Sequence, residues 1–446
     1  MRPGSRVRAG ALAAGVVLAL AAIVGCAGGA GGGSASDPGA PGSSSAVAPS
    51  TTPATGLTIT ALGMVYVNDI SHDASWVIGD EPRAPGASEP KPLVLMNRVT
   101  GAQTILCDWA DPDLGFCSMA EQGAMIPETP NLVVEQVDTS VVGWFPSGGV
   151  YVVDTASGTR TRLDTDSAGV PLEPSWKAGE CEGGCDYHWA PHLNVSADSV
   201  SGDGRIAAFC ANYEKPKEPV LYVKDLGTGT LTRTTVLCGV NRFGRESDTD
   251  EWSDEGMSYP QISADGSVVH VNGNRSTGGE YGKVGWEADT LYFPTTGETR
   301  TVDGSGGMTR DGGTVFIRQG VQATEPEADV VPEYGAYAVA TGEVTPLPWM
   351  QEFVSTPAMP HYPFDTFRQA SSDGRWVVNH GSVRDVRSGA ETDIGALLQE
   401  TGYEPSTGEG TLRISGDGSV VIANVVHDPL AESSSRVVAV SGWDSD

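Results

Sequence analysis

Two short turns recur in fixed order along most of this 446-residue chain, and they constrain its fold more than any other feature. The first turn is an Asp-Gly pair followed by a β-rich run, and a weaker copy of it is Ser71-His72-Asp73-Ala74. The second turn has a Gly after a small or hydroxyl residue, between two predicted strands. Because the two turns join four short strands into two hairpins, each unit predicts a four-stranded antiparallel blade. The Asp-Gly pairs are Asp203-Gly204, Asp265-Gly266, Asp311-Gly312, Asp373-Gly374 and Asp417-Gly418, and the second-turn glycines are Gly101, Gly158, Gly229, Gly297, Gly342 and Gly389.

The spacing of these units indicates how many there are. Successive second-turn glycines lie 57, 71, 68, 45 and 47 residues apart. The shorter spacings match the roughly 40 to 50 residues of one propeller blade, and the longer ones require inserted loops. Six full units are visible, followed by a seventh that ends early, so we predict an all-β, seven-bladed β-propeller. The 58 glycines and 29 prolines suit a turn-rich chain, in which Ile394–Thr401 is the one segment of useful helical periodicity.

The incomplete seventh unit predicts how the ring closes. Its turn Asp417-Gly418 is followed by strands at Val420–Val426 and Arg436–Val440, after which the chain ends without an outermost strand. Leu57–Leu62, LTITAL, alternates like a strand and has no partner in its own first unit. We therefore expect this N-terminal strand to complete the last blade, because an open ring would leave exposed edges. The alternative is that Leu57–Leu62 is only the end of a linker.

The N-terminal segment, residues 1–26, predicts export and membrane anchoring. Three arginines precede an apolar run from Ala9 to Val24, which is too short to span a membrane comfortably and is typical of a secretory signal. Its end, Ile23-Val24-Gly25-Cys26, resembles the bacterial lipoprotein box. This resemblance implies that Cys26 is diacylated, becomes the mature N-terminus and anchors the protein to the cell membrane on its extracytoplasmic side. The alternative is an ordinary signal peptide with a chance Cys.

Composition separates a tether from the folded part and limits the partners. Ala27–Gly56 is almost entirely Gly, Ala, Ser, Pro and Thr, so we predict a disordered tether before a propeller domain at residues 57–446. The formal charge of −30 argues against nucleic acid and against anionic lipid headgroups. We expect a monomer, with the membrane reached through the lipid anchor.

The cysteines predict disulfides. Without the acylated Cys26 an even number remains, and disulfides are the default in an exported protein. Cys210 ends a second strand and Cys238 lies just beyond the fourth strand of the same unit, so a bridge between them would staple one blade. Local bridges within the other two pairs would close loops, although the connectivity stays open. The six cysteines are Cys107, Cys117, Cys181, Cys185, Cys210 and Cys238.

The insertions predict which side of the propeller binds a ligand. Turns between strands 1 and 2 and between strands 3 and 4 share one side and are always short, whereas nearly every insertion falls in connections of the other side. The insertions are Asp108–Pro130, Asp164–Pro191, Gly239–Ser258, Gly273–Ala288, Gln319–Glu333 and Pro348–Thr366. We predict a binding face there, formed by aromatic and imidazole side chains, although for most of the tryptophans taken singly the favoured explanation is packing of long loops onto the blades. The predicted residues are Trp109, Trp176, His188, Trp189, His192, Trp252, Trp286, Trp349 and His361.

Two clusters have the residue types of metal ligands. Cys181, Cys185, His188 and His192 have zinc-like spacing, but in an exported protein Cys181 and Cys185 are expected to form a disulfide. The run SDTDEWSDEG has Asp248, Asp250 and Asp254 as weak Ca²⁺ candidates, yet it lacks the Gly of an EF-hand loop and also reads as a solvated acidic loop. We expect no cofactor.

The repeat motifs resemble a known family. QISADGSVVHV with LYFPTTGETRTV, RISGDGSVVIA, and Leu221 to Gly229 are similar to the TolB-type propeller repeats known as WD40-like or PD40 repeats. This resemblance covers about residues 57 to 442 and implies an architecture, not an activity. The chain departs from TolB in having no separate N-terminal α/β domain and in its predicted lipid anchor.

Two functions of different class follow. The first is a non-catalytic envelope lipoprotein whose propeller binds a protein, peptide or glycan. The alternative is a propeller enzyme, such as a polysaccharide lyase or glycan hydrolase, with its site on the long-loop face. Candidate catalytic groups for it are His188, His361, His380, Asp248 and Asp250, but they show no recognisable acid and base spacing, and there is no Gly-x-Ser-x-Gly nucleophile motif. We therefore favour the binding module.

Overall fold

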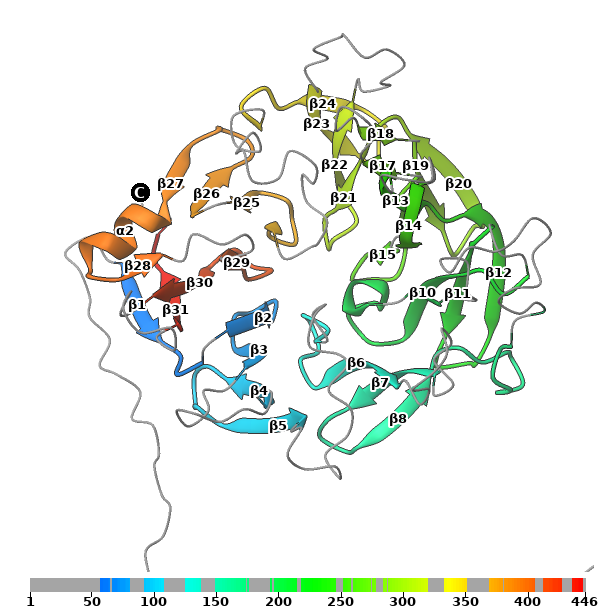
Figure 1. The fold of residues 1–446 in the computed structure, drawn as a ribbon, viewed down its shortest axis with the longest axis horizontal. Helices are drawn as coiled ribbons and strands as arrows, with labels where there is room; N and C mark the ends of the chain where they lie inside the picture. The colour runs from blue at the N-terminus through cyan, green and yellow to red at the C-terminus, as the bar shows by residue number, and fades with distance from the viewer. Residues whose placement is uncertain are drawn as a thin grey trace, which may run out of the picture. The chain divides into compact units, whose positions relative to one another are not determined.

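The computed structural model shows a ring of seven blades around a central axis (Figure 1). It describes residues 57–64, 66–80, 92–107, 125–137, 149–173, 175, 193–194, 196–214, 218–245, 252–257, 260–273, 275–277, 284–286, 288–319, 333–350, 369–379, 381–405, 412–426 and 435–443. All of these belong to one compact unit, Ala46–Asp446. The seven-bladed, all-β fold predicted from the repeats is confirmed.

The first four blades contain three or four antiparallel strands each, and strand 1 is the innermost. Blade 1 is β2 (Tyr66–Ile70), β3 (Trp76–Asp80), β4 (Leu93–Asn97) and β5 (Gln103–Cys107). Blade 2 is β6 (Leu132–Val137), β7 (Gly149–Asp154) and β8 (Thr159–Arg162), with a bridge from Met125 to Val133 at the inner position. Blade 3 is β9 (Leu193–Asn194), β10 (Ile206–Ala211), β11 (Val220–Asp225) and β12 (Leu231–Leu237), with the short 3-10 helix η1 (Ala197–Ser199). Blade 4 is β15 (Gln261–Ile262), β16 (Val269–Val271), β19 (Asp289–Phe293) and β20 (Glu298–Val302).

The last three blades follow the same plan. Blade 5 is β21 (Ser305–Met308), β22 (Thr314–Gln319), β23 (Glu333–Ala338) and β24 (Val344–Pro346). Blade 6 is β25 (Trp376–Asn379), β26 (Ser382–Asp385) and β27 (Glu391–Asp393), with Ala370 bridged to Val377. Helix α2 (Ile394–Glu400) follows, where helical periodicity was predicted, and Asp393 caps it by accepting from Ala396 N. Blade 7 is β29 (Leu412–Ile414), β30 (Val420–Val426), β31 (Ser435–Ser441) and β1 (Thr58–Ala61), and β28 (Glu404–Pro405) pairs with the end of β30.

The Asp-Gly turns form because a hydroxyl and a carboxylate two residues apart replace missing backbone hydrogen bonds. Ser263 Oγ donates to Asp265 Oδ1 at 2.7 Å, Ser267 N donates to the same oxygen at 2.9 Å, and Val268 N donates back to Ser263 Oγ at 3.0 Å. Gly266 follows with φ +73°, a left-handed conformation that favours glycine. In the weaker first copy Ala74 takes this place with φ 58°, as the one non-glycine residue with positive φ among those described.

The N-terminal strand closes the ring as predicted. β1 pairs antiparallel with β31, with Thr58 opposite Ser441 and Ala61 opposite Val438. The side chains of Leu57 and Ile59 are buried with blade 7, and Leu62 packs in the core between blades 7 and 1. One short segment therefore supplies the outer strand of blade 7 and seals its junction with blade 1.

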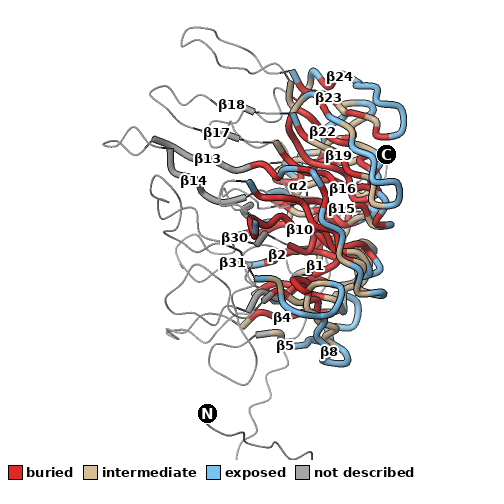
Figure 2. The backbone as a smooth tube through the Cα atoms, turned by 90° about the vertical axis from the view of Figure 1, so that its right-hand side faces the viewer, coloured by how far each residue is buried: buried red, intermediate tan, exposed pale blue. Residues whose placement is uncertain are grey.

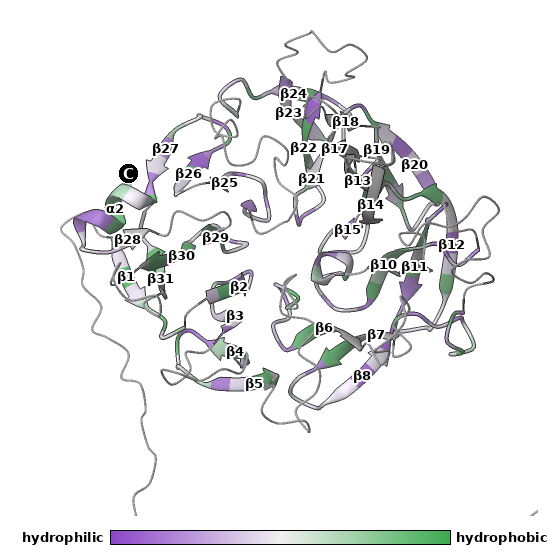
Figure 3. Ribbon diagram, in the orientation of Figure 1, coloured by the Kyte–Doolittle hydropathy of each residue, from purple (hydrophilic) through white to green (hydrophobic). Residues whose placement is uncertain are grey.

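The core consists of layers between adjacent blades. Ala208 and Leu221 of blade 3 face Ile262 and Val269 of blade 4, and the same pattern continues around the ring. Figure 2 shows buried residues along the strands and exposed turns along one side. Figure 3 shows hydrophobic residues in β30 of blade 7 and more hydrophilic ones in β20, the outermost strand of blade 4.

Candidate functional site

The two sides of the propeller differ in the length of their connections. The turns between strands 1 and 2 and between strands 3 and 4 are four to six residues long, except in blade 3, where eleven residues that include η1 separate β9 from β10. We call the side that these turns share the turn side. The connections between strands 2 and 3 and between blades lie on the opposite, loop side, because antiparallel strands alternate in direction. The connection from β5 to the inner position of blade 2 at Met125 alone runs from residue 108 to 124.

Most of the predicted site residues lie outside the described residues. These are Trp109, Trp176, His188, Trp189, His192, His361, His380, Asp248 and Asp250, together with Cys26, Cys117, Cys181 and Cys185. Their grouping into a binding face or metal site stays a prediction. In the described part of the chain, no group of three or more His, Cys, Asp or Glu could hold a metal ion.

Two of the predicted insertions combine into one sheet, which sequence analysis treated as separate loops. The sheet has the order β14 (Trp252–Met257), β13 (Val240–Arg245), β17 (Arg275–Thr277) and β18 (Val284–Trp286). β13 follows the last strand of blade 3, β17 follows the second strand of blade 4, and the two pair in parallel. We call this the added sheet. It extends from the loop side and holds Trp252 and Trp286 in opposite edge strands.

Trp349 is placed elsewhere. Its ring lies 5.1 Å from the guanidinium of Arg384 in blade 6, and Arg384 Nη1 donates to its carbonyl at 3.2 Å. A Cβ at Gly389 would approach the indole to 3.3 Å. The indole therefore packs a connection from blade 5 onto blade 6.

A buried carboxylate lies where the added sheet joins the propeller. Asp289 Oδ1 accepts from Gly273 N at 2.8 Å, and Oδ2 accepts from Gly306 N at 2.9 Å and from Asn272 Nδ2 at 3.3 Å. Gly273 lies two residues before β17, and Asp289 follows β18 on the return of the chain. The carboxylate thus ties both ends of this insertion to each other and to the first strand of blade 5.

His270 completes the network. Its Nε2 lies 2.9 Å from Asp289 Oδ2 and its Nδ1 lies 3.2 Å from Gln261 Oε1, and the side chains of His270 and Asp289 are fully buried. Met308 N donates to the same Gln261 oxygen at 2.8 Å, which identifies it as an acceptor. Both ring nitrogens therefore lie within hydrogen-bond distance of an oxygen that can accept. Since His270 is enclosed on all sides, this pair is placed to support structure and not to contact a ligand.

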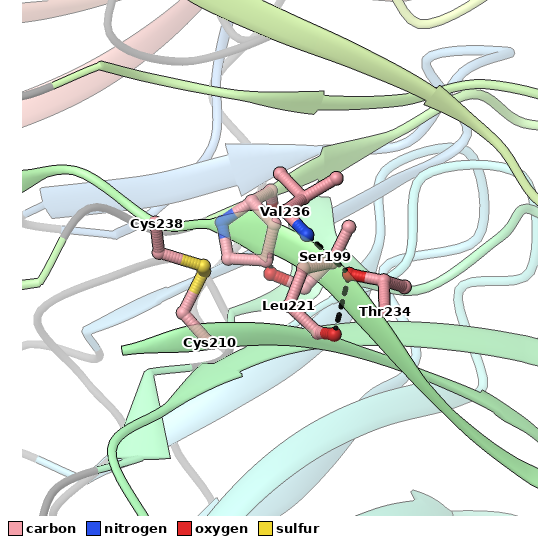
Figure 4. Close-up of a disulfide and its surroundings, with 7 residues drawn as sticks. Ser199, Cys210, Leu221, Thr234, Val236 and Cys238 are labelled. Carbon is pink, nitrogen blue, oxygen red and sulfur yellow. Dashed lines mark hydrogen bonds between the residues drawn. A yellow bond between two sulfur atoms is a disulfide. The ribbon is translucent and has the colours of Figure 1, made fainter. Parts of the chain in front are cut away.

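The connection from blade 3 to β13 of the added sheet is held by the disulfide Cys210–Cys238, as the blade model predicted (Figure 4). Cys210 lies opposite Leu221 in β11, and a residue of the next strand over would ordinarily lie about 9.5 Å away. A bulge in β12 brings the end of this strand closer to Cys210. At the bulge, Thr234 Oγ1 donates to Leu221 O at 2.9 Å and accepts from Val236 N at 3.0 Å. Cys238 directly follows β12, and its Cα lies 6.0 Å from the Cα of Cys210.

The turn side is closed by a circle of hydrogen bonds that runs through all seven blades. Each inner turn contacts the next, and the last contacts the first. The links are His72 N to Pro127 O, Thr129 Oγ1 to Gly202 O, Gly202 N to Ala264 O, Ala264 N to Arg310 O, Asp311 N to Ser372 O, Ser372 N to Gly416 O and Asp417 N to His72 O. We call these seven turns the hub. A repeat alone does not reveal these contacts, because each joins residues far apart in sequence.

Side chains of opposite blades meet within the hub. Arg310 of blade 5 is 2% exposed and donates to Glu128 of blade 2 at 2.9 Å, to Val200 O at 2.9 Å and to Ile262 O at 3.0 Å. A Cβ at Gly202 would lie 3.0 Å from the Glu128 side chain, so the glycine leaves room for the ion pair.

A second contact within the hub joins blades 1 and 6 across the inner turn of blade 7. His72 Nδ1 lies 3.0 Å from Ser372 Oγ. Gly416 lies between these two side chains, and a Cβ there would overlap both of them. The residues that differ from one inner turn to the next are thus complementary in size and charge. Sequence analysis did not identify them as one set.

Within the described residues no helix is long and apolar enough to cross a membrane.

Burial lowers the pKa of Lys224, although the Asp166 carboxylate opposes this shift. Its ammonium donates to Thr165 O and Asp166 O, each at 2.8 Å, and so holds the connection after blade 2 against blade 3. This buried amine is therefore part of the framework.

The fold defines the chain as a seven-bladed β-propeller protein. No protein-family model matches the sequence, and no curated protein matches it, so its resemblance to WD40-like repeats stays a prediction. Among solved structures it is similar to an oligogalacturonate lyase in complex with manganese, with 13% identity, 88% of this chain and 95% of that chain covered, and a TM-score of 0.44.

Two further propellers have a similar fold. TolB from Acinetobacter baumannii is 13% identical over 84% of each chain with a TM-score of 0.34. The β-propeller domain of the Trilobed protease from Pyrococcus furiosus is 10% identical over 82% of this chain and 78% of that chain, with a TM-score of 0.35. These remote likenesses assign no activity, substrate or partner to the chain.

Proposed function

We propose that this protein is an exported, membrane-anchored lipoprotein whose propeller is a non-catalytic binding module for a protein, peptide or glycan at the cell envelope. The observation that carries the binding role is the added sheet. Two insertions from neighbouring blades pair in parallel on the loop side, whereas the turn side has short turns and a hub closed by hydrogen bonds. A scaffold that builds additional structure on one side is expected to use that side.

Removal of half the added sheet tests this role. In the full chain, residues 274–287 are replaced by an Asn-Gly turn, which removes β17 and β18 while keeping the blade strands on either side. Arrays of glycans and of peptides identify binders of the unmodified protein, and we expect the shortened variant to bind them at least about tenfold more weakly. The control is Val99→Ser, a substitution of an exposed residue in a turn-side loop.

Two outcomes would argue against this function. Unchanged binding after removal of β17 and β18, with loss in the turn-side control, would place the site on the other side. Turnover of a polysaccharide on the same array would support a propeller lyase or glycan hydrolase instead. The buried His270–Asp289 pair offers no support for that chemistry, because a general base must reach its substrate.

Anchoring is tested separately at Cys26. Two acyl chains give stable membrane attachment because each buried methylene contributes about 0.8 kcal/mol. We expect Cys26→Ser to move the protein from the membrane fraction to the medium, measured by fractionation of cells that produce either form. Unchanged retention in the membrane fraction would show that the protein is held there in another way.

A further inference from the structure

Three of the four points at which the chain enters or leaves the added sheet lie together. β13 begins directly after Gly239, β17 begins two residues after Gly273, and the return from β18 reaches the blade at Asp289. Gly239 N donates to Asn272 O at 2.9 Å, and a Cβ on Gly239 would overlap the carbonyls of Asn272 and Gly273. The close approach of these two backbones therefore requires glycine at position 239.

One carboxylate joins these points to the blades. Asp289 accepts four hydrogen bonds, from Gly273 N, Asn272 Nδ2, Gly306 N and His270 Nε2. Asn272 Nδ2 also donates to Gly306 O at 2.8 Å. Because Asp289, His270 and Asn272 are buried, a lost bond leaves a buried polar atom unsatisfied, which is costly away from water.

The network is specific to blade 4. At the position of His270 in the second strand, the neighbouring blades have Ala208 and Phe316, which are apolar and belong to the core. Blade 4 is also the blade whose second-to-third-strand insertion carries β17 and β18. The polar group thus replaces ordinary core packing at the place where the added sheet is attached.

From these contacts we propose that Asp289 and His270 are positioning residues that hold the added sheet in one orientation on the propeller. The inference deepens the proposed binding function, since it identifies what orients the binding surface, and it rests on that function for its biological meaning. Asp289 holds the start of the insertion by accepting from Gly273 N. His270 contacts the Asp289 carboxylate and is itself positioned by Gln261, whose side-chain oxygen also accepts from Met308 N of blade 5.

Asp289→Asn is the sharpest test. Three donors surround Oδ2 and one faces Oδ1, so the Asn carbonyl oxygen is favoured at the Oδ2 position and its NH₂ group then faces Gly273 N. The substitution removes the bond to the root of β17 while it keeps the size of the side chain. Amide hydrogen exchange of the full chain, read by mass spectrometry, measures the result. We expect protection in β13, β14, β17 and β18 to fall about tenfold or more, with blades 1 and 7 unchanged.

Asp164→Asn is the matched control. Asp164 is also a buried carboxylate, and it pairs with Arg162 at 2.8 Å and accepts from Val150 N in blade 2. We expect this control to leave exchange in the added sheet unchanged. Equal exchange of the added sheet in Asp289→Asn and Asp164→Asn would overturn the proposal.

Gly239→Ala disturbs the close approach of the chain before β13 to Asn272 and Gly273. It tests the positioning role if Asp289→Asn does not fold. Its control is Gly79→Ala in blade 1, where a Cβ would overlap Tyr66 O in a similar way. We expect faster exchange in the added sheet for Gly239→Ala only, and slow exchange there would contradict the proposal. Since no ligand enters these measurements, a failed binding screen and a failed positioning role are distinguished.

Discussion

At the scale of single residues, the ionised aspartates of the inner turns stabilise the fold. Burial opposes the ionisation of Asp265, but hydrogen bonds from Ser263, Ser267 and the backbone outweigh it and lower its pKa. The pKa of Asp73 is lowered in the same way, against burial, by Ser75 and Ser71. These carboxylates thus favour the folded state when they are charged.

The direction of the shift predicts an acid-sensitive fold. A pKa that is lower in the folded than in the unfolded state contributes stability above the unfolded value, about 3.9, and this contribution is lost as the pH falls through the folded value. We expect the thermal midpoint to fall below about pH 4 and to change little through these groups above about pH 5. Asp265→Asn should make this fall shallower, because Asn accepts the same bonds without charge. Equal pH profiles for both proteins would contradict this account.

A second residue-scale prediction concerns Arg310 and Glu128 in the hub. Arg310→Met removes the donor to the Glu128 carboxylate and to the carbonyl oxygens of Val200 and Ile262, so we expect it to lower the free energy of unfolding by about 3 kcal/mol. Glu128→Gln should cost less, because this side chain is 21% exposed. Chemical denaturation of both single variants and the double variant measures the coupling, and the double variant should lose less than the sum.

Arg205→Met is the control for this pair. Arg205 lies 3.4 Å from Asp225 with 58% of its side chain exposed, and surface pairs of this kind contribute less than about 1 kcal/mol. If Arg310→Met were no more destabilising than Arg205→Met, the hub pair would have no special role.

At the scale of elements, the disulfide and the bulge of β12 act as one unit. The bridge closes a loop with a sequence separation of 28 residues, which the chain-entropy model values at about 3 kcal/mol. We expect the double variant Cys210→Ala, Cys238→Ala to lose about this much, measured by denaturant unfolding. If this double variant were as stable as the unmodified chain, the bulge alone would be sufficient to hold the chain at position 238 in place.

At the scale of the whole molecule, the ring depends on a strand from its own N-terminus. Leu57 and Ile59 are each 3% exposed, and burying an apolar side chain of this size contributes about 2 kcal/mol. Deleting residues 56–62 should therefore lower the thermal midpoint sharply and promote association through the exposed edge of β31.

Deleting residues 27–50 is the control for closure. Because this deletion keeps β1, the thermal midpoint and the size measured by light scattering should stay as in the full chain. A deletion of residues 56–62 that left both quantities unchanged would mean that the hub alone closes the ring.

Much of the fold could be predicted from the sequence, because its signals are local. The Asp-Gly turns need a hydroxyl two residues before the carboxylate and a glycine after it, and each requirement is visible within five residues. The disulfide followed from placing Cys210 and Cys238 in one blade. In the added sheet, β17 and β18 were missed because they are three residues long, too short for alternation to show. The six-residue strands β13 and β14 were missed because their sequences, VNRFGR and WSDEGM, do not alternate between apolar and polar residues.

The sequence by itself determined the number of blades, the strand that closes the ring and the side that carries the insertions, since turn chemistry and alternation act over a few residues. Only the tertiary structure decided which distant residues meet. The pairing of β13 with β17, the ion pair between Glu128 and Arg310, and the network of His270 and Asp289 each join separate segments. Their physical reason is the same: buried polar groups must find partners, and the packing of the blades alone determines which partners are in reach.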